Sequence, residues 1–116
     1  MLESVLKAKI HRAVVTEASL DYEGSIAISK SLLDASGIRH FEQVMVANFT
    51  NGERWWTYAI PADQGTIGLN GGSARKGVPG DIVAIFAYIL VTPEEDHCPR
   101  IVLVGEGNEV QDIITC

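Results

Sequence analysis

The chain has 116 residues, of which 47% are hydrophobic and 21% are charged. This length and composition predict one globular domain over residues 1–116, large enough for a single core but small for a chain that folds alone. The formal charge of −6 and a pI near 4.9 argue against a nucleic-acid partner, because a nucleic-acid surface needs clustered cations.

The first predicted element is a strand from Val5 to Val15, along which apolar and polar residues alternate. No signal-peptide pattern precedes it, so we expect a cytoplasmic protein. Lys9 and His11 fall on the polar side of this strand and point the same way. Taken alone, the pair indicates a solvated strand face.

A short polar turn, Tyr22-Glu23-Gly24-Ser25-Ile26, follows between two apolar runs. Most Gly-Ser pairs are simply turns. Gly24 can adopt a positive φ, however, and leave its carbonyl open to attack by the Ser25 hydroxyl. The resulting N→O acyl shift would convert the amide into an ester. Loss of the Ser25 α-proton would then cleave the chain after Gly24, and hydrolysis with loss of ammonia would leave a pyruvoyl group at position 25.

Ile26 to Ile28 can form a short strand after the turn. Ser29 then predicts the cap of a helix over residues 30–36, and Gly37 predicts its end. The helix carries no pattern of reactive residues, so we interpret it as structural. Its inward-facing residues are expected to be Leu32, Leu33 and Ala35.

A hairpin is predicted next. Val44 to Phe49 is one strand, Asn51-Gly52 is a strong turn signal, and Arg54 to Ile60 is the returning strand, ended by Pro61. The two-residue turn fixes the two strands as antiparallel neighbours.

Alternation along the returning strand divides its side chains between two faces. Arg54, Trp56 and Tyr58 share one face, while Trp55 and Thr57 share the other. Taken alone, Arg54 indicates a surface charge and Tyr58 a core residue with its hydroxyl at the rim.

Residues 62–80 are rich in turns and glycine. Within them, Asn70-Gly71-Gly72-Ser73 has a superficial likeness to a phosphate loop, but it lacks the Gly-Lys-Ser/Thr ending of one. Small residues at these positions would allow the backbone to approach a ligand closely.

An apolar run from Ile82 to Val91 predicts a strand buried on both faces, too short to cross a bilayer. Thr92 to Pro99 is a polar loop, Ile101 to Val104 a last strand, and residues 105–116 are expected to be loosely held. Roughly six short strands with one or two short helices predict a mainly β protein, a small β-barrel.

Cys98 and Cys116 are far apart in the sequence. No Cys-x-x-Cys or His pair accompanies them, so we expect no metal site. We interpret both as reduced thiols, with Cys116 in a frayed terminus. No membrane partner is expected.

Several motifs, in this order and spacing, resemble those of the bacterial aspartate 1-decarboxylases, pyruvoyl-dependent enzymes that make β-alanine. The resemblance runs from about Met1 to Arg100. The motifs are Lys9-Ile10-His11-Arg12, Tyr22-Glu23-Gly24-Ser25, Thr50-Asn51-Gly52-Glu53-Arg54, Thr57-Tyr58-Ala59-Ile60, Asn70-Gly71-Gly72 and Gly80-Asp81-Ile82-Val83.

The resemblance implies a six-stranded double-psi β-barrel that assembles as a homotetramer with sites at subunit boundaries. It implies self-cleavage into residues 1–24 and 25–116, with a covalent pyruvoyl group generated from Ser25 as the cofactor. L-Aspartate would be the substrate, in pantothenate biosynthesis. A maturation factor, as in some bacteria, is a further implied partner.

It also implies roles for individual residues. Tyr58 would return a proton to the substrate carbon as a general acid. Arg54 and Lys9 would bind the two carboxylates of aspartate, with His11 beside Lys9. We expect Arg54 to hold the retained side-chain carboxylate, because gripping the departing one would oppose its loss. Residues expected to border the substrate are Asn70, Gly71, Gly72 and Ser73.

Thr57 would hydrogen-bond the carbonyl of Gly24 and promote cleavage. Strict alternation puts Thr57 opposite Arg54 and Tyr58, which leaves two interpretations: a bulge re-aims it, or one strand serves two pockets at a subunit boundary. Ala47 stands where many family members carry an aromatic residue, and Ser73 stands where alanine is usual.

Two alternatives stay open from the sequence. One is a pyruvoyl enzyme that decarboxylates another amino acid, against which Arg54 and Lys9 together favour a dicarboxylate. The other is a non-enzymatic β-barrel binding module, such as a swapped-hairpin DNA-binding dimer. A binding module would run as one band on a denaturing gel, whereas a matured decarboxylase would run as two.

Overall fold

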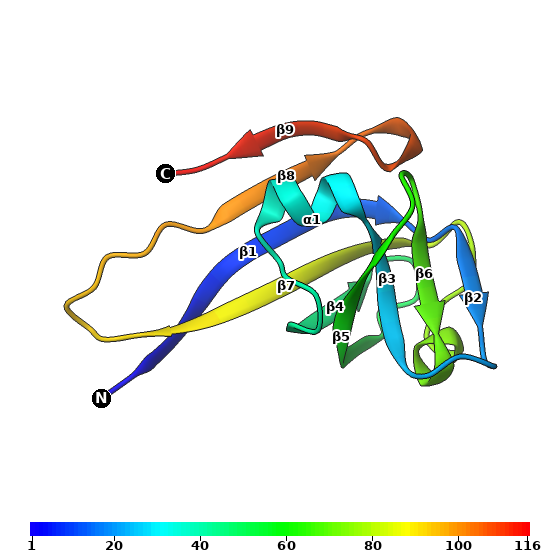
Figure 1. Ribbon diagram of the computed structural model, residues 1–116, viewed down its shortest axis with the longest axis horizontal. Coiled ribbons are helices and arrows are strands. Elements are labelled where there is room, and N and C mark those ends of the chain that lie inside the picture. The colour runs from blue at the N-terminus through cyan, green and yellow to red at the C-terminus, as the bar shows by residue number, and fades with distance from the viewer.

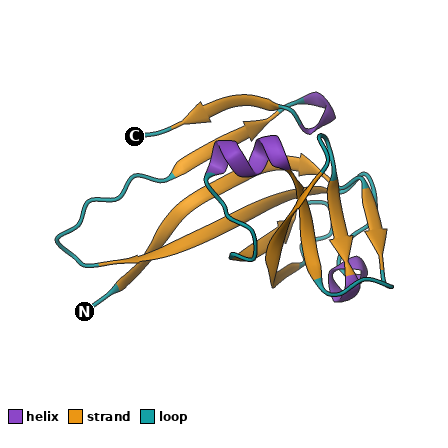
Figure 2. Ribbon diagram, viewed as in Figure 1, coloured by secondary structure: helices purple, strands orange, loops and turns teal.

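The computed structural model describes all of residues 1–116 and is mainly β, as predicted (Figure 1; Figure 2). Its elements are β1 (Glu3–Val14), β2 (Glu17–Ser19), β3 (Ser25–Ser29), α1 (Lys30–Ser36), β4 (Gln43–Asn48), β5 (Arg54–Ala62), β6 (Ile67–Asn70), η1 (Gly71–Arg75), β7 (Ile82–Val91), β8 (Arg100–Val104), η2 (Glu106–Asn108) and β9 (Val110–Ile114).

The nine strands form one twisted sheet in the order β2-β6-β3-β5-β4-β7-β1-β8-β9. The sheet is not closed, and β2 and β9 are its edges. The expected number of six strands is therefore wrong. Three strands escaped prediction: β2, β6 and β9. β2 and β9 are short and lack apolar alternation, and each forms only by pairing with one neighbouring strand, β6 or β8. β6 has only four residues and lies in the glycine-rich stretch that we interpreted as turns, and it forms by pairing with β2 and β3.

The core consists of 18 buried residues, most of them on the inward faces of the strands and of α1. Alternation accounts for it: Val44 and Val46 of β4 and Val83 and Ile85 of β7 are fully buried on the same side of the sheet. α1 ends at Gly37 in the left-handed conformation, as predicted. It buries Leu32, Leu33 and Ser36, with Ala35 partly buried against the core.

β1 lies between β7 and β8 in the sheet (Figure 1). It pairs antiparallel with β7 from Glu3–Val91 to Val14–Ile82, and parallel with β8. The β1–β7 register shifts between His11 and Ala13, where Arg12 has a φ of 70°. Such a bulge adds one residue to a strand and turns the side chains beside it.

Three local predictions need correction. β5 continues through Pro61, which pairs with Ile28 of β3. β4 pairs with β5 only as far as Tyr58, so the missing N–H of Pro61 interrupts no bond to β4. Ser29 stands at the cap of α1, but its hydroxyl makes no capping bond and accepts the Gly65 N–H at 3.0 Å. β7 is exposed rather than buried from Tyr88 to Leu90.

The C-terminal tail is held, not loose. β9 pairs with β8, and Asn108 anchors the turn before it. The Asn108 side chain accepts the Val14 N–H at 2.8 Å and donates to the carbonyls of Val14 and Gly65 at 2.8 and 2.9 Å. Asn108 has a φ of 58°, a conformation that asparagine tolerates better than most residues.

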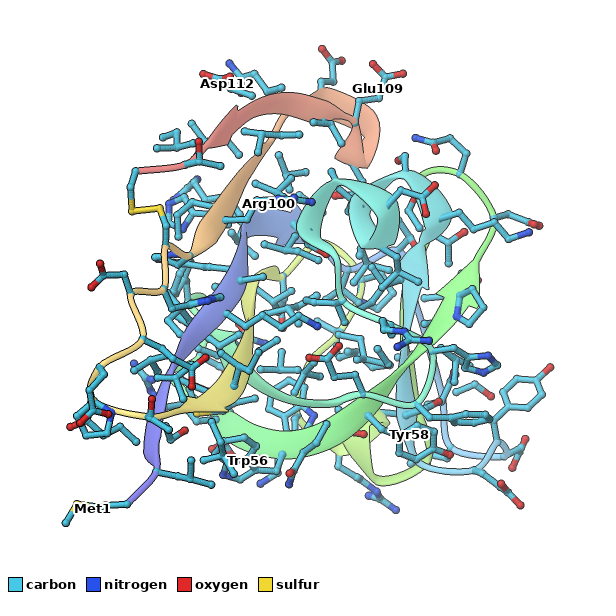
Figure 3. The ribbon with its side chains drawn as sticks, turned by 60° about the vertical axis from the view of Figure 1, so that its left-hand side comes forward. Met1, Trp56, Tyr58, Arg100, Glu109 and Asp112 are labelled. Atoms are coloured by element: carbon cyan, nitrogen blue, oxygen red, sulfur yellow. A yellow bond between two sulfur atoms is a disulfide. The ribbon has the colours of Figure 1, made fainter.

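Cys98 and Cys116 form a disulfide, so the expectation of two reduced thiols is wrong for this structure (Figure 3). The β8–β9 pair returns the chain end to the start of β8, which leaves the two Cα atoms 5.7 Å apart. A separation of 18 residues hid this proximity in the sequence. No helix in the structure is long and apolar enough to span a membrane.

Candidate active site

The Gly24–Ser25 turn ends where β3 begins, and Ser25 is only 2% exposed. Its hydroxyl donates to the Glu23 carbonyl at 3.4 Å and accepts a hydrogen bond from the Asn70 side-chain amide at 3.1 Å. Ser25 and Asn70 are register partners across β3 and β6. The Ser25 hydroxyl therefore has one polar contact within the turn and one to the neighbouring strand β6.

Gly71 packs directly against this turn. It has a φ of +62°, and a Cβ added there would lie 2.7 Å from both the Gly24 nitrogen and the Tyr22 carbonyl oxygen. Only glycine fits such a contact. The positive φ expected at Gly24 is not observed, and the left-handed residue is Gly71, on the wall facing it.

A pocket of about 400 Å³ opens beside Gly24. It lies where β5 has an unpaired edge, since β4 covers one edge from Arg54 to Tyr58 but β3 joins the other only at Ala59. The residues lining it are Gly24, Trp55, Trp56, Thr57, Tyr58, Gly72, Ser73 and Lys76.

This unpaired edge answers the question raised by Thr57. The β4–β5 register has no shift, so no bulge re-aims Thr57. Thr57 and Tyr58 point to opposite faces of β5, yet both line the pocket because it opens on the edge of the strand. Figure 3 labels Trp56 and Tyr58, two of the residues of β5 that line this pocket. One pocket of one chain therefore has both residues in its lining.

Lys9 and His11 lie elsewhere. His11, Ala84, Ala47 and Arg54 form one row of paired residues across β1, β7, β4 and β5. Adjacent strands are about 4.8 Å apart, so about 14 Å of sheet separates His11 from Arg54. Ala47, the residue that replaces an expected aromatic, is a buried member of this row.

The surroundings of Lys9 and His11 are mainly aromatic. The Lys9 Nζ lies 5.4 Å from the centre of the Phe86 ring, and the His11 ring packs against Phe49 at 5.9 Å. The His11 Nδ1 is buried and has no hydrogen-bond partner. Burial, followed by the charges of Lys9 and Arg12, lowers the pKa of His11, so the neutral imidazole is favoured.

Comparison with known proteins decides the family. The sequence profile of the family described as "Aspartate decarboxylase" matches residues 1–111. The chain belongs to the aspartate decarboxylase family.

Individual relatives cover nearly the whole chain. The aspartate 1-decarboxylase of Phenylobacterium zucineum is 51% identical over 115 residues, spanning 96% of this chain and 98% of that protein. The enzyme of the same name from Caulobacter vibrioides is 52% identical over 115 residues, with the same shares. That of Desulfotalea psychrophila is 47% identical over 118 residues, spanning 98% of this chain and 99% of that protein. The resemblance found in the sequence is thereby confirmed.

Within one chain, the residues expected to act for the family fall into two groups. Asn70 and Gly71 contact the Gly24–Ser25 turn, and Gly72 and Ser73 line the pocket together with Thr57 and Tyr58. Arg54 is exposed at the start of β5 and makes no ion pair within the chain. Lys9 and His11 are not brought to the pocket.

Sequence reasoning missed two features of the pocket. The Trp55 indole N–H donates to the Ser73 hydroxyl at 3.0 Å, so two residues treated as separate form one contact. Lys76 is the only cation among the residues that line the pocket. The sequence could have indicated Lys76 as a pocket residue, because it lies three residues after Ser73 in a glycine-rich turn.

Proposed function

We propose that this chain is an aspartate 1-decarboxylase that converts L-aspartate to β-alanine and CO₂, for pantothenate biosynthesis. The observation that carries the proposal is the Gly24–Ser25 turn. Ser25 is buried, its hydroxyl is held by Asn70, and Gly71 supports the backbone of the turn, in a chain of the aspartate decarboxylase family.

The chain would cleave itself between Gly24 and Ser25, giving residues 1–24 and 25–116. The Ser25 hydroxyl would attack the Gly24 carbonyl, and the Thr57 hydroxyl, which makes no hydrogen bond within the chain, is available in the pocket to stabilise the oxyanion. A small group at position 25 fits the site, because glycines border it. The resulting pyruvoyl group would supply an electrophilic carbonyl that accepts the electrons of the breaking C–C bond.

Side chains of the site would bind the substrate and move a proton. Tyr58 lines the pocket and its hydroxyl makes no hydrogen bond within the chain, so it can donate a proton to the substrate carbon. Arg54 and Lys9 would bind carboxylates. Arg54 is expected to hold the retained one, since tight binding of the departing carboxylate would stabilise the ground state.

A homotetramer with sites at subunit boundaries would bring Lys9 and His11 to the pocket of a neighbouring chain. Two observations support this. The His11 Nδ1 is buried without a partner. In addition, an apolar groove of about 570 Å³ includes Trp56 and Tyr88, which are 58% and 37% exposed. Exposed aromatic side chains of this kind are typical of interfaces.

The double-psi barrel is likewise a proposal. The six strands β6-β3-β5-β4-β7-β1 are consecutive in the sheet and supply most of the core. Just after β1, the Thr16 N–H donates to the Ile67 carbonyl of β6 at 2.8 Å, which brings the ends of this series together. β2, β8 and β9 would then be additions outside the barrel. The cytoplasmic location and the maturation factor stay predictions.

Intact mass spectrometry of the purified protein, with CO₂ release from L-aspartate, tests the function. We expect two fragments, the larger lighter than a serine-ended peptide by the mass of ammonia. Ser25→Ala should stay folded, uncleaved and inactive. An unbroken chain after prolonged warm incubation, or CO₂ release by Ser25→Ala, would contradict the proposal. Release from another amino acid but not from aspartate would favour the alternative substrate.

A further inference from the structure

Residues 39–42 form a tight turn between α1 and β4. The Glu42 N–H donates to the Arg39 carbonyl at 3.0 Å, so Phe41 is the third residue of a β-turn. Phe41 has a φ of 70°. Turns with a positive φ at this position favour glycine or asparagine, and a bulky side chain there is an outlier. The sequence thus places a phenylalanine where the backbone disfavours one.

The same turn pairs with β5 as a β-bulge, directly beside Tyr58. The Phe41 N–H donates to the Ala59 carbonyl at 2.7 Å, and the Ala59 N–H donates to the Glu42 carbonyl at 3.0 Å, so two residues oppose one. The Glu42 carboxylate also accepts a hydrogen bond from the Lys7 ammonium group at 2.8 Å, which ties the turn to β1. Bulges are frequent next to active sites, where they re-aim a side chain. The backbone of Phe41 is therefore fixed relative to the strand that carries Tyr58.

The Phe41 ring lies against the Tyr58 ring although Phe41 is 68% exposed. The two ring centres are 6.0 Å apart and their planes are inclined at 44°, within the range in which aromatic rings attract each other. His40 stacks on the Phe41 ring, with the ring centres 3.8 Å apart. So exposed a ring gains little from burial, and burial does not account for a phenylalanine in a left-handed conformation.

We propose that Phe41 is a positioning residue for Tyr58. Its ring, held by the turn and the bulge, restrains the Tyr58 ring and so keeps the hydroxyl in place for proton transfer in the pocket that Tyr58 lines. This inference rests on the proposed function, in which Tyr58 returns a proton to the substrate carbon. Proton transfer needs the donor at about 3 Å from its acceptor, and a ring that moves freely reaches that geometry less often. The left-handed backbone of Phe41 is then a cost in stability that serves activity.

Kinetics and thermal melting of Phe41→Asn and Phe41→Gly test the proposal. Both substitutions remove the ring and suit the left-handed backbone better. Once intact mass shows equal maturation, kcat for aspartate should fall roughly threefold to tenfold with KM nearly unchanged, while the melting temperature stays level or rises.

Phe41→Tyr is the matched control, because it keeps a ring on the same backbone and should keep the native kcat. Native kcat in both variants that lack the ring would overturn the proposal, and a lower melting temperature in them would then show that the ring serves stability instead. A fall in kcat as large in Phe41→Tyr would also overturn it.

A double-mutant cycle asks whether Phe41 acts through the Tyr58 hydroxyl. When Phe41→Asn is added to Tyr58→Phe, kcat should fall no further, because no proton donor remains to be positioned. An equal further fall would give Phe41 a general structural role and refute the assignment. If the native chain releases no CO₂ from aspartate, the proposed function fails; if Tyr58→Phe is impaired but the Phe41 variants are not, only this inference fails.

NMR of the tyrosine rings tests the restraint without catalysis, in uncleaved Ser25→Ala chains. The chain has three tyrosines, so labelled tyrosine gives three sets of ring signals, and Tyr58→Phe identifies those of Tyr58. Phe41→Asn should shift the Tyr58 signals and leave those of Tyr22 and Tyr88 in place. Unchanged Tyr58 signals would overturn the proposal even in a chain without activity.

Discussion

The pocket beside Gly24 and the polar face of β1 are built in opposite ways. Around the pocket, hydrogen bonds and close packing fix the turn: Asn70 holds Ser25, and Gly71 contacts the Gly24 backbone. On β1, Lys9 has only an aromatic ring beside it, and the His11 Nδ1 is buried without a partner. The Gly24–Ser25 turn is held by contacts within a single chain, whereas the Lys9 and His11 side chains make no hydrogen bond there.

The difference separates two parts of the proposed chemistry. The proposed self-cleavage would use Ser25, Asn70 and Gly71, which one chain brings together. Catalysis would in addition need Lys9 and His11, which lie several strands away in the same sheet. We infer that maturation depends on the fold of one chain, whereas turnover depends on the assembly.

Gly71→Ala should give the largest effect, because its Cβ would collide with the backbone of Gly24. We expect at least a hundredfold slower cleavage, or a chain that fails to fold, measured by intact mass over time and by circular dichroism. Gly72→Ala is the matched control, since a Cβ there meets nothing within 4 Å. Normal cleavage by Gly71→Ala would show that the contact does not position the turn.

Tyr58→Phe should leave maturation intact and lower kcat for aspartate by about two to four orders of magnitude, with little change in KM. The ring and its packing against Phe41 remain, and only the proton donor is lost. Mass spectrometry must first show equal maturation. Near-normal kcat would make Tyr58 a packing residue, and His11 would become the next candidate for the acid.

Mixing inactive chains tests the assembly. Co-expressed Ser25→Ala and Lys9→Ala chains should recover about a quarter of native activity if each site combines Ser25 of one subunit with Lys9 of its neighbour. A mixture of Ser25→Ala with Tyr58→Phe should recover nothing, because Tyr58 lines the pocket beside Gly24, the neighbour of Ser25, in the same chain. Mixed oligomers without activity in the first mixture would refute the shared site.

His11 should produce the smallest effect, a pH dependence of stability. Its folded pKa lies below its ordinary value of 6.5, so the unfolded chain binds the proton more readily. Its contribution is therefore fully present above pH 6.5 and is lost as the pH falls through the folded pKa. When the pH falls from 7 to 5, the melting temperature of His11→Gln should drop by a few degrees less than that of the native chain. His40→Gln, which changes an exposed histidine, should lose as much as the native chain. If the melting temperatures of the native chain and of both variants fell equally with pH, the effect would not come from His11.

Local patterns predicted the elements that support the site. Asn51-Gly52 gave the β4–β5 hairpin, and Gly37 gave the end of α1. The pocket itself could not be predicted, because it depends on β3 pairing with β5 only from Ala59 onward, a long-range register. Lys76 was missed for the same reason, since asparagines 28 and 25 residues away hold its carbonyl.

The central position of β1 has a consequence for refolding. After cleavage, residues 1–24 would still contain β1, paired on both edges, with Ala8 and Ile10 fully buried. The short fragment could not dissociate without breaking the core. Once unfolded, however, the two fragments would have to meet again by diffusion, so recovery would be second order in protein concentration. Uncleaved Ser25→Ala chains would form each folded subunit at a rate independent of dilution. Maturation would thus leave a subunit that is durable while folded and difficult to rebuild.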